Sequence, residues 1–286
     1  RDSFLKYAYE RWTPVPGWSF LVGAGTFDYK NLYGLSNRKN FLPPYEMGDD
    51  VVGDFSLLHG NWSYDDWFVY LTPDNFPDMA IGRTTVESPQ ETRWIADKVV
   101  EYEKRDLGVW RNRVLLIADD EFGGGTPNEI VHTQDTEALS GLIPREVDVV
   151  KVYLMEYERV GAEKPGARDD IIGYTDEGVL AGSFLGHGSY RRLTHETVVL
   201  NPRDINALRN QGRQPFFYYG SCEVGEFERD ADRGLADFMQ KQRDRGGVAT
   251  LGATRTTTSS ANYTLGTHLF ARLFGDSAMT IGDAVV

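Results

Sequence analysis

"RVLLIADD", Arg113 to Asp120, is the stretch that best indicates the fold of this chain. Its apolar residues follow one another without alternation, which is typical of a strand covered by helices on both faces. The preceding segment, residues 91–105, places apolar residues at helical spacing with charged residues opposite. The two patterns together predict a helix followed by a buried strand of a parallel sheet.

The same alternation of strand and helix continues to the end of the chain. Predicted strands cover residues 147–155, 179–188, 215–221 and 247–254, and predicted helices cover about 130–142, 167–177, 201–211, 232–243 and 262–273. Strands that alternate with helices over short links form a parallel sheet with helices on both faces. We therefore expect residues 85–286 to form one large α/β domain.

The first 84 residues are less regular. A helical pattern over 3–12 and a strand-like run over 18–25 precede a stretch rich in Pro, Asn and Asp, which leads to a short strand at 78–83. We expect residues 1–84 to form a smaller N-terminal α/β subdomain that packs on the larger domain.

Composition excludes several classes of protein. The chain has 43 acidic and 30 basic residues and a net charge of −13, which argues against nucleic acid or an anionic membrane as the main partner. No apolar run approaches the roughly 20 residues of a membrane span. The single cysteine cannot form an internal disulfide. Because the chain starts at Arg1 without a leader, we expect it to be part of a longer precursor with flanking domains.

Three predicted strands end in reactive side chains. Cys222 follows "PFFYYGS", His187 lies in "FLGHGS", and Glu121 follows "RVLLIADD". Ligands of an open parallel sheet bind beyond the carboxyl ends of its strands, so these side chains are expected to face one cleft. A thiol, an imidazole and a carboxylate are the groups needed for acyl transfer through a covalent intermediate. The alternatives are a cysteine packed as a small apolar residue, and Asp119 or Asp120 in place of Glu121.

Each group has a physical reason to be there. A thiol is only slightly ionised at neutral pH and needs a base, and histidine can take its proton and return it to a leaving amine. A carboxylate such as Glu121 would fix the orientation of the His187 ring. The amides of Gly188 and Cys222 could face the developing oxyanion.

The motifs "GHGS" and "SCEVGEF", together with "PDMAIGR", "LLIADDEFGGG" and "GGVATLGATRTTTSSANYTLGTHLFARLF", resemble the gingipain peptidases of the caspase-like clan over roughly residues 75–286. The resemblance implies a caspase-like α/β/α sandwich with a parallel-rich sheet. It also implies Cys222 as nucleophile, His187 as proton shuttle and Glu121 as the residue that orients the imidazole. The implied function is a cysteine endopeptidase acting on protein or peptide substrates, outside the cell or on its surface.

Other functions remain open at this stage. The segment "GATRTTTSSANYTLGTHLF" also resembles the gingipain-type domain of the surface sortase of type IX secretion, which transfers a cleaved chain to an acceptor. Hydrolysis and transfer pass through the same acyl-enzyme. A catalytically idle surface interaction module and a small-molecule α/β enzyme are the further alternatives.

The resemblance also suggests two substrate-binding positions. Arginine-specific gingipains resemble this chain around "GGGTPNEIVH", where Glu129 is the nearest acidic candidate for a basic P1 side chain. Ser259 stands near the place where they carry a tryptophan wall, so a trypsin-like pocket is in doubt. The alternative for Glu129 is a solvated residue in the first turn of a helix.

No cofactor is expected to be required. "EFGGGT" lacks the Gly-Lys-Ser/Thr ending of a P-loop, and Asp28 stands where a dinucleotide fingerprint needs its third glycine. His59, His132, His195 and His268 lack the spacing of zinc ligands. Calcium as a structural ion is compatible with the acidic loops "EMGDD", "YDDW" and "TPDNFPD", for which simple turn formation is the alternative.

Overall fold

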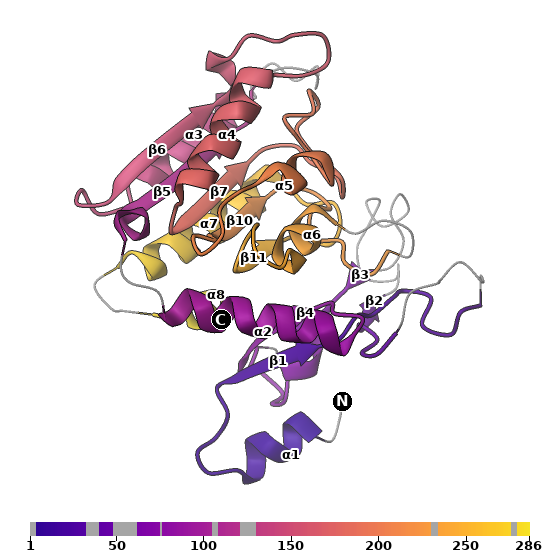
Figure 1. The fold of residues 1–286 in the computed structure, drawn as a ribbon. Coiled ribbons are helices and arrows are strands. Elements are labelled where there is room, and N and C mark those ends of the chain that lie inside the picture. The colour runs from indigo at the N-terminus through magenta and orange to yellow at the C-terminus, as the bar shows by residue number, and fades with distance from the viewer. Residues whose placement is uncertain are drawn as a thin grey trace.

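The computed structural model describes residues 4–32, 40–47, 62–74, 76–104, 108–120, 130–229, 234–275 and 279–286. Its centre is a five-stranded parallel sheet with the strand order β11-β10-β7-β5-β6 (Figure 1). The strands are β5 (Arg113–Ala118), β6 (Asp148–Tyr153), β7 (Ala181–Leu185), β10 (Phe216–Gly220) and β11 (Ala249–Gly252). Each lies inside a segment that the sequence predicts to be a strand.

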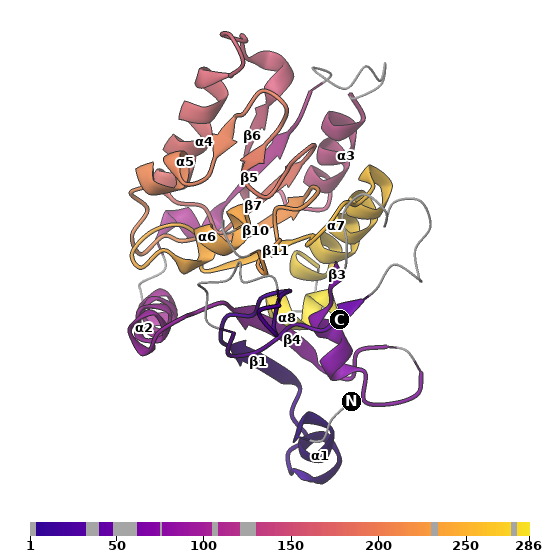
Figure 2. The ribbon, with the colours of Figure 1, turned by 90° about the vertical axis from the view of Figure 1, so that its right-hand side faces the viewer.

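Helices cover both faces of this sheet. Figure 2 shows α3 (Ile130–Ser140) and α7 (Ser259–Leu273) on one face, and α4 (Pro165–Glu177), α5 (Arg203–Ala207) and α6 (Leu235–Lys241) on the other. The predicted α/β/α arrangement with a parallel sheet is confirmed.

The strand β5 shows why the sheet is buried on both sides. Leu115 and Ile117 belong to the core under α4 and α6, whereas Val114 and Leu116 belong to the core under α3 and α7. All four side chains are fully buried. Because successive side chains of a strand point to opposite faces, a strand between two cores must be apolar at every position.

The N-terminal part is smaller. It contains α1 (Phe4–Arg11), the parallel pair β1 (Trp18–Val22) and β4 (Ala80–Thr84), and the antiparallel pair β2 (Glu46–Met47) and β3 (Trp62–Ser63). The helix α2 (Pro89–Lys104) connects it to the central sheet, and α8 (Ile281–Val285) returns from the C-terminus to pack on β4. The predicted division after residue 84 falls at the end of β4 and remains a prediction.

Parts of the structure differ from the sequence-based expectation. The helix predicted over 201–211 is only α5, because Leu208 is extended and buries its side chain. A short hairpin of β8 (Arg192–Leu193) and β9 (Val199–Leu200) follows β7 and was not predicted. In the part of the chain that the structure describes, no helix combines the length and apolar character needed to cross a bilayer.

Candidate active site

The strands that carry His187 and Cys222 are neighbours in the sheet. Leu185 of β7 pairs with Gly220 of β10, and the histidine and the cysteine each lie two residues beyond these paired positions. The two strand ends are also in contact, because a Cβ on Gly188 would lie 2.2 Å from Ser221 Oγ and 3.3 Å from the Cys222 carbonyl oxygen. A glycine at position 188 therefore lets the two loops approach this closely.

The Cys222 thiol is half-buried and is held by the loop after β11. The Thr257 N–H donates to Cys222 Sγ at 3.4 Å, and Sγ lies 3.5 Å from the Thr257 carbonyl oxygen. Burial raises the pKa of this thiol, the Thr257 N–H opposes that effect, and the negative charge of Glu223 adds to it. The thiol consequently needs a base to ionise at neutral pH.

The main chain of His187 is fixed at both ends. Its N–H donates to Asp119 Oδ2 at 2.8 Å, and its carbonyl oxygen accepts from the Thr194 N–H at 2.8 Å. The imidazole is in contact with two other histidine rings. The buried ring of His132 on α3 is perpendicular to it at a centroid distance of 5.6 Å, and the ring of His195, an exposed residue, lies at 4.5 Å.

From the sequence, His132 and His195 are candidates only for zinc binding, and their spacing does not favour it. Their position beside His187 depends on α3 and on the hairpin after β7, and no spacing in the sequence signals it.

The candidate oxyanion donors lie at the contact between the two loops. Gly188 pairs with Leu193 in an antiparallel bridge. The bonds of this bridge are donated by the Ser189 and Thr194 N–H groups, to Arg192 and His187 carbonyls respectively, and neither uses the Gly188 N–H. That geometry leaves the Gly188 amide outside the bridge.

Four buried charged side chains lie beneath the His187 loop. We call this set, consisting of Asp119, Asp120, Lys164 and Glu196, the lysine cluster. Its three carboxylates place one oxygen each within 4.8 Å of one another, and the Lys164 ammonium donates to Asp120 and to the Leu154 carbonyl. Among the described residues, these acidic groups lie close enough to share a cation, and Lys164 supplies that positive charge.

Burial also makes two carboxyl groups of the lysine cluster harder to ionise. Burial raises the pKa of Asp119 to about 8, although the hydrogen bonds from the His187 and Asp120 N–H groups lower it. Burial, followed by the neighbouring Asp120 carboxyl group, raises the pKa of Glu196 to about 7. The sequence indicates Asp119 and Asp120 as candidates, but it does not indicate Lys164 or Glu196, which come from distant loops.

A second charged set lies beside Cys222. It consists of Glu226, Glu228, Arg229 and Arg255, and we call it the arginine cluster. Arg255 pairs with Glu228 and, at 3.5 Å, with Glu226, which also pairs with Arg229 at 3.0 Å. The Arg255 carbonyl oxygen accepts the Glu223 N–H at 3.2 Å, so this set fixes the residue next to the cysteine.

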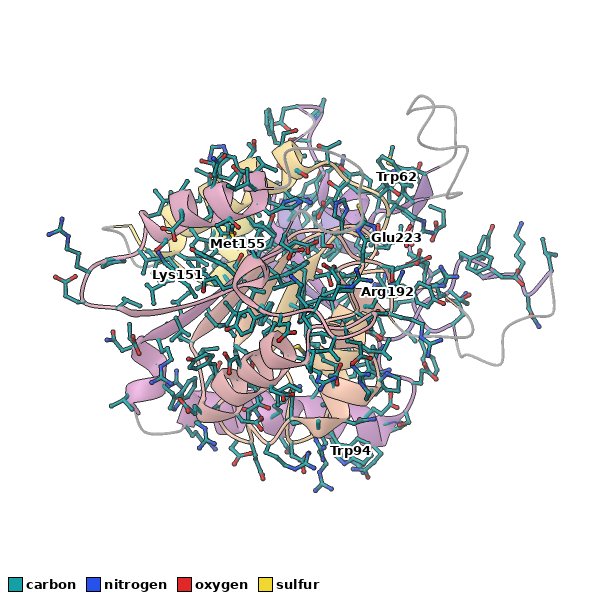
Figure 3. The ribbon with its side chains drawn as sticks, turned by 90° about the horizontal axis from the view of Figure 1, so that it is seen from above. Trp62, Trp94, Lys151, Met155, Arg192 and Glu223 are labelled. Atoms are coloured by element: carbon teal, nitrogen blue, oxygen red, sulfur yellow. The ribbon has the colours of Figure 1, made fainter. Side chains whose placement is uncertain are left out.

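The N-terminal part contacts the loops of this site. Thr254 Oγ1 donates to the Ser63 carbonyl at 3.3 Å, and the Phe27 N–H donates to the Glu228 carbonyl at 3.3 Å. Seen from above, Trp62 of β3, Glu223 and Arg192 occur on the same side of the molecule (Figure 3). The N-terminal part of the chain therefore contacts the segments that follow β10 and β11.

The remaining predicted site residues are placed as follows. Glu121 and Glu129 lie outside the described residues. Ser259 is exposed and begins α7, two residues after the Thr257 that holds Cys222 Sγ.

Of the acidic loops considered for calcium, "TPDNFPD" shows turn formation. Asp78 accepts the N–H groups of Leu71 and Thr72, and Asp74 accepts the Phe76 N–H. In "YDDW", Asp65 pairs with Arg83, and "EMGDD" lies mostly outside the described residues. Calcium binding stays a prediction.

A thiol and an imidazole at the ends of adjacent parallel strands, in a sheet between two helical layers, are the arrangement that the resemblance to the caspase-like clan implies. The chain belongs to peptidase family C25, the gingipain family, because the model of that family matches residues 2–286. The resemblance that the motifs indicate is thereby confirmed.

Known relatives are distant. Gingipain R2 of Porphyromonas gingivalis (strain ATCC BAA-308 / W83) is 23% identical over 189 residues, which cover 63% of this chain and 24% of the relative. Gingipain R1 of Porphyromonas gingivalis is also 23% identical over 189 residues, or 18% of its length. The chain thus spans about a quarter or less of these relatives.

Solved structures support the fold. The crystal structure of the Arg-specific cysteine proteinase gingipain R matches with a TM-score of 0.73 and 17% identity, over 98% of this chain and 59% of that chain. A complex of the pro- and mature domains of RgpB from Porphyromonas gingivalis matches with a TM-score of 0.73 and 18% identity, over 98% and 60% respectively. At this identity the match is evidence for the caspase-like fold alone.

Proposed function

We propose that this chain is the catalytic part of a cysteine endopeptidase in which Cys222 is the nucleophile and His187 the proton shuttle. The observation that carries the proposal is the contact between the two strand ends, where Gly188 packs on Ser221 and the Cys222 carbonyl. Membership in a family of cysteine peptidases supports it.

The chemistry follows from the local environment. Because burial raises the pKa of the Cys222 thiol, His187 takes the thiol proton as the sulfur attacks a peptide carbonyl. The Gly188 and Cys222 amides stabilise the oxyanion. His187 then gives its proton to the leaving amine, and the thioester is cleaved by water, which regenerates the thiol. Glu121 is proposed to orient the imidazole.

The proposal extends to substrate and location. Glu129 and Ser259 are proposed to contact the substrate side chain next to the cleaved bond. An extracellular or cell-surface location is proposed from the resemblance to gingipains. If an amine in place of water takes the acyl group, the same site acts as a transpeptidase.

An electrophilic peptide library, analysed by mass spectrometry of the adduct, tests the proposal. We expect labelling at Cys222 in the wild type, and none in Cys222→Ala, which should bind substrate without turnover. A peptide substrate offered with and without an amine acceptor separates hydrolysis from transfer. A folded wild type that is not labelled would indicate an idle interaction module.

A further inference from the structure

Asp119 is in close contact with the main chain around His187. It directly follows the last residue of β5, is 1% exposed, and donates its own N–H to the Leu185 carbonyl at 3.0 Å. A Cβ on Gly186 would lie only 2.3 Å from Asp119 Cβ. Glycine at 186 therefore allows the aspartate side chain to lie directly against the loop that carries His187.

Both carboxylate oxygens of Asp119 accept main-chain amides. Oδ2 accepts the His187 N–H at 2.8 Å, and Oδ1 accepts the Asp120 N–H at 3.0 Å. The first of these bonds joins the end of β5 to the end of β7, across the sheet edge where Cys222 also lies. The Asp119–His187 bond and the bond from the Thr194 N–H to the His187 carbonyl together fix the main chain that carries the imidazole.

We propose that Asp119 is a positioning residue, whose carboxylate holds the His187 main chain so that the imidazole meets Cys222. The inference rests on the proposed function, in which His187 moves the proton. Asp119 is buried beneath the loop and acts only through His187. Below it, Lys164 binds the neighbouring Asp120, and Glu196 lies close to both aspartates.

The rings beside the imidazole do not replace this contact. His132 and His195 lie against the ring of His187 and restrict its rotation, whereas Asp119 binds the main-chain N–H of His187. A displacement of about 1 Å in a reacting group can cost on the order of 10²-fold in rate. Since Asp119 is buried beneath the loop, its loss is expected to lower kcat and to leave KM nearly unchanged.

The test compares Asp119→Leu with Asp119→Asn in a wild type first shown to be labelled at Cys222. Leucine keeps the branched shape without an acceptor, and asparagine keeps one acceptor oxygen. We expect kcat to fall on the order of 10²-fold in the leucine variant, and less in the asparagine variant, with KM within about 2-fold of the wild type. Hydrogen exchange of the peptide that spans residues 186–189 should be faster in the leucine variant.

Asp78 offers a matched control. Its carboxylate also accepts two main-chain amides, from Leu71 and Thr72 at 2.7 and 2.8 Å, in the N-terminal part of the chain. Asp78→Leu and Asp78→Asn should lower Tm and keep kcat within about 2-fold of the wild type.

Two results would overturn the inference. The first is a folded Asp119→Leu variant with the kcat of the wild type. If leucine prevents folding, the corresponding result is an Asp119→Asn variant with wild-type kcat and with unchanged hydrogen exchange of residues 186–189. The other is a loss of kcat that the Asp78 variants reproduce at equal Tm. A wild type that is not labelled at Cys222 instead removes the proposed function, and this inference with it.

Discussion

The lysine cluster and the arginine cluster support the two sides of the candidate site with different charge balances. The arginine cluster sets two guanidinium groups against two carboxylates, whereas the lysine cluster sets one ammonium against three carboxylates. Guanidinium groups stay charged at any accessible pH. Burial raises the pKa of carboxyl groups on both sides. The difference is that only the cysteine side has a cation for each carboxylate.

The largest expected effect comes from removing the cation of the arginine cluster. Arg255 is 8% exposed and its partner Glu228 is fully buried, so Arg255→Met leaves a buried carboxylate without its counter-charge. Breaking a buried pair in this way typically costs about 3–5 kcal/mol. We expect a loss of this size in the free energy of unfolding, measured by urea denaturation.

A double variant sharpens this prediction. Arg255→Met with Glu228→Gln removes both charges, so it should recover part of the lost stability. A loss below about 1 kcal/mol in Arg255→Met would mean that the pair contributes no more than an exposed one, and the contrast between the two clusters would lose its basis.

The lysine cluster is expected to make stability depend on pH. The pKa of Asp119 rises from 3.8 to about 8 on folding, and that of Glu196 from 4.5 to about 7. Between the unfolded and folded values the folded chain holds protons that the unfolded chain has released. These two groups make their full contribution to the free energy of unfolding below about pH 4. The contribution is lost as the pH rises to about 8, by about 1.4 kcal/mol per pH unit for each group that is protonated only in the folded chain.

Urea denaturation at several pH values measures this slope. Asp119→Asn cannot titrate, so its stability should fall less steeply than that of the wild type between pH 5 and pH 8. If the free energy of unfolding changed equally with pH in the two proteins, Asp119 would be ionised over this whole range, and its proton would contribute nothing to stability.

The sequence predicts much of the fold. The inner strands β5 and β10 contain uninterrupted apolar runs such as Val114–Ala118, and burial between two helical layers produces that pattern. The edge strand β6 is less regular, because it carries the polar residues Asp148 and Lys151. The hairpin of β8 and β9 has strands of two residues, which are too short to show any alternation. The helix predicted over 201–211 fails after Ala207, because packing of the Leu208 side chain outweighs local helix propensity.

The sequence predicts less of the candidate site. The rule that ligands bind at the carboxyl ends of strands placed His187 and Cys222 at one edge, and the strands that carry them are neighbours in the sheet. The supports of this edge could not be predicted. Glu196 and Lys164 reach Asp120 from separate loops, and a charged residue in a sequence does not indicate which partner it meets.

The smallest expected effect comes from an exposed pair on the edge strand β6. Lys151 donates to both oxygens of Glu137 at 2.8 Å, and both side chains are substantially exposed. Water and salt screen such a pair, and its net contribution is typically below about 1 kcal/mol. Lys151→Met should therefore change the free energy of unfolding by less than that amount. The distances in the Lys151–Glu137 pair are as short as those of a buried pair, so the two pairs differ mainly in burial. If Lys151→Met lost as much free energy of unfolding as Arg255→Met, burial would not be what makes the ion pairs of the site stronger than those of the surface.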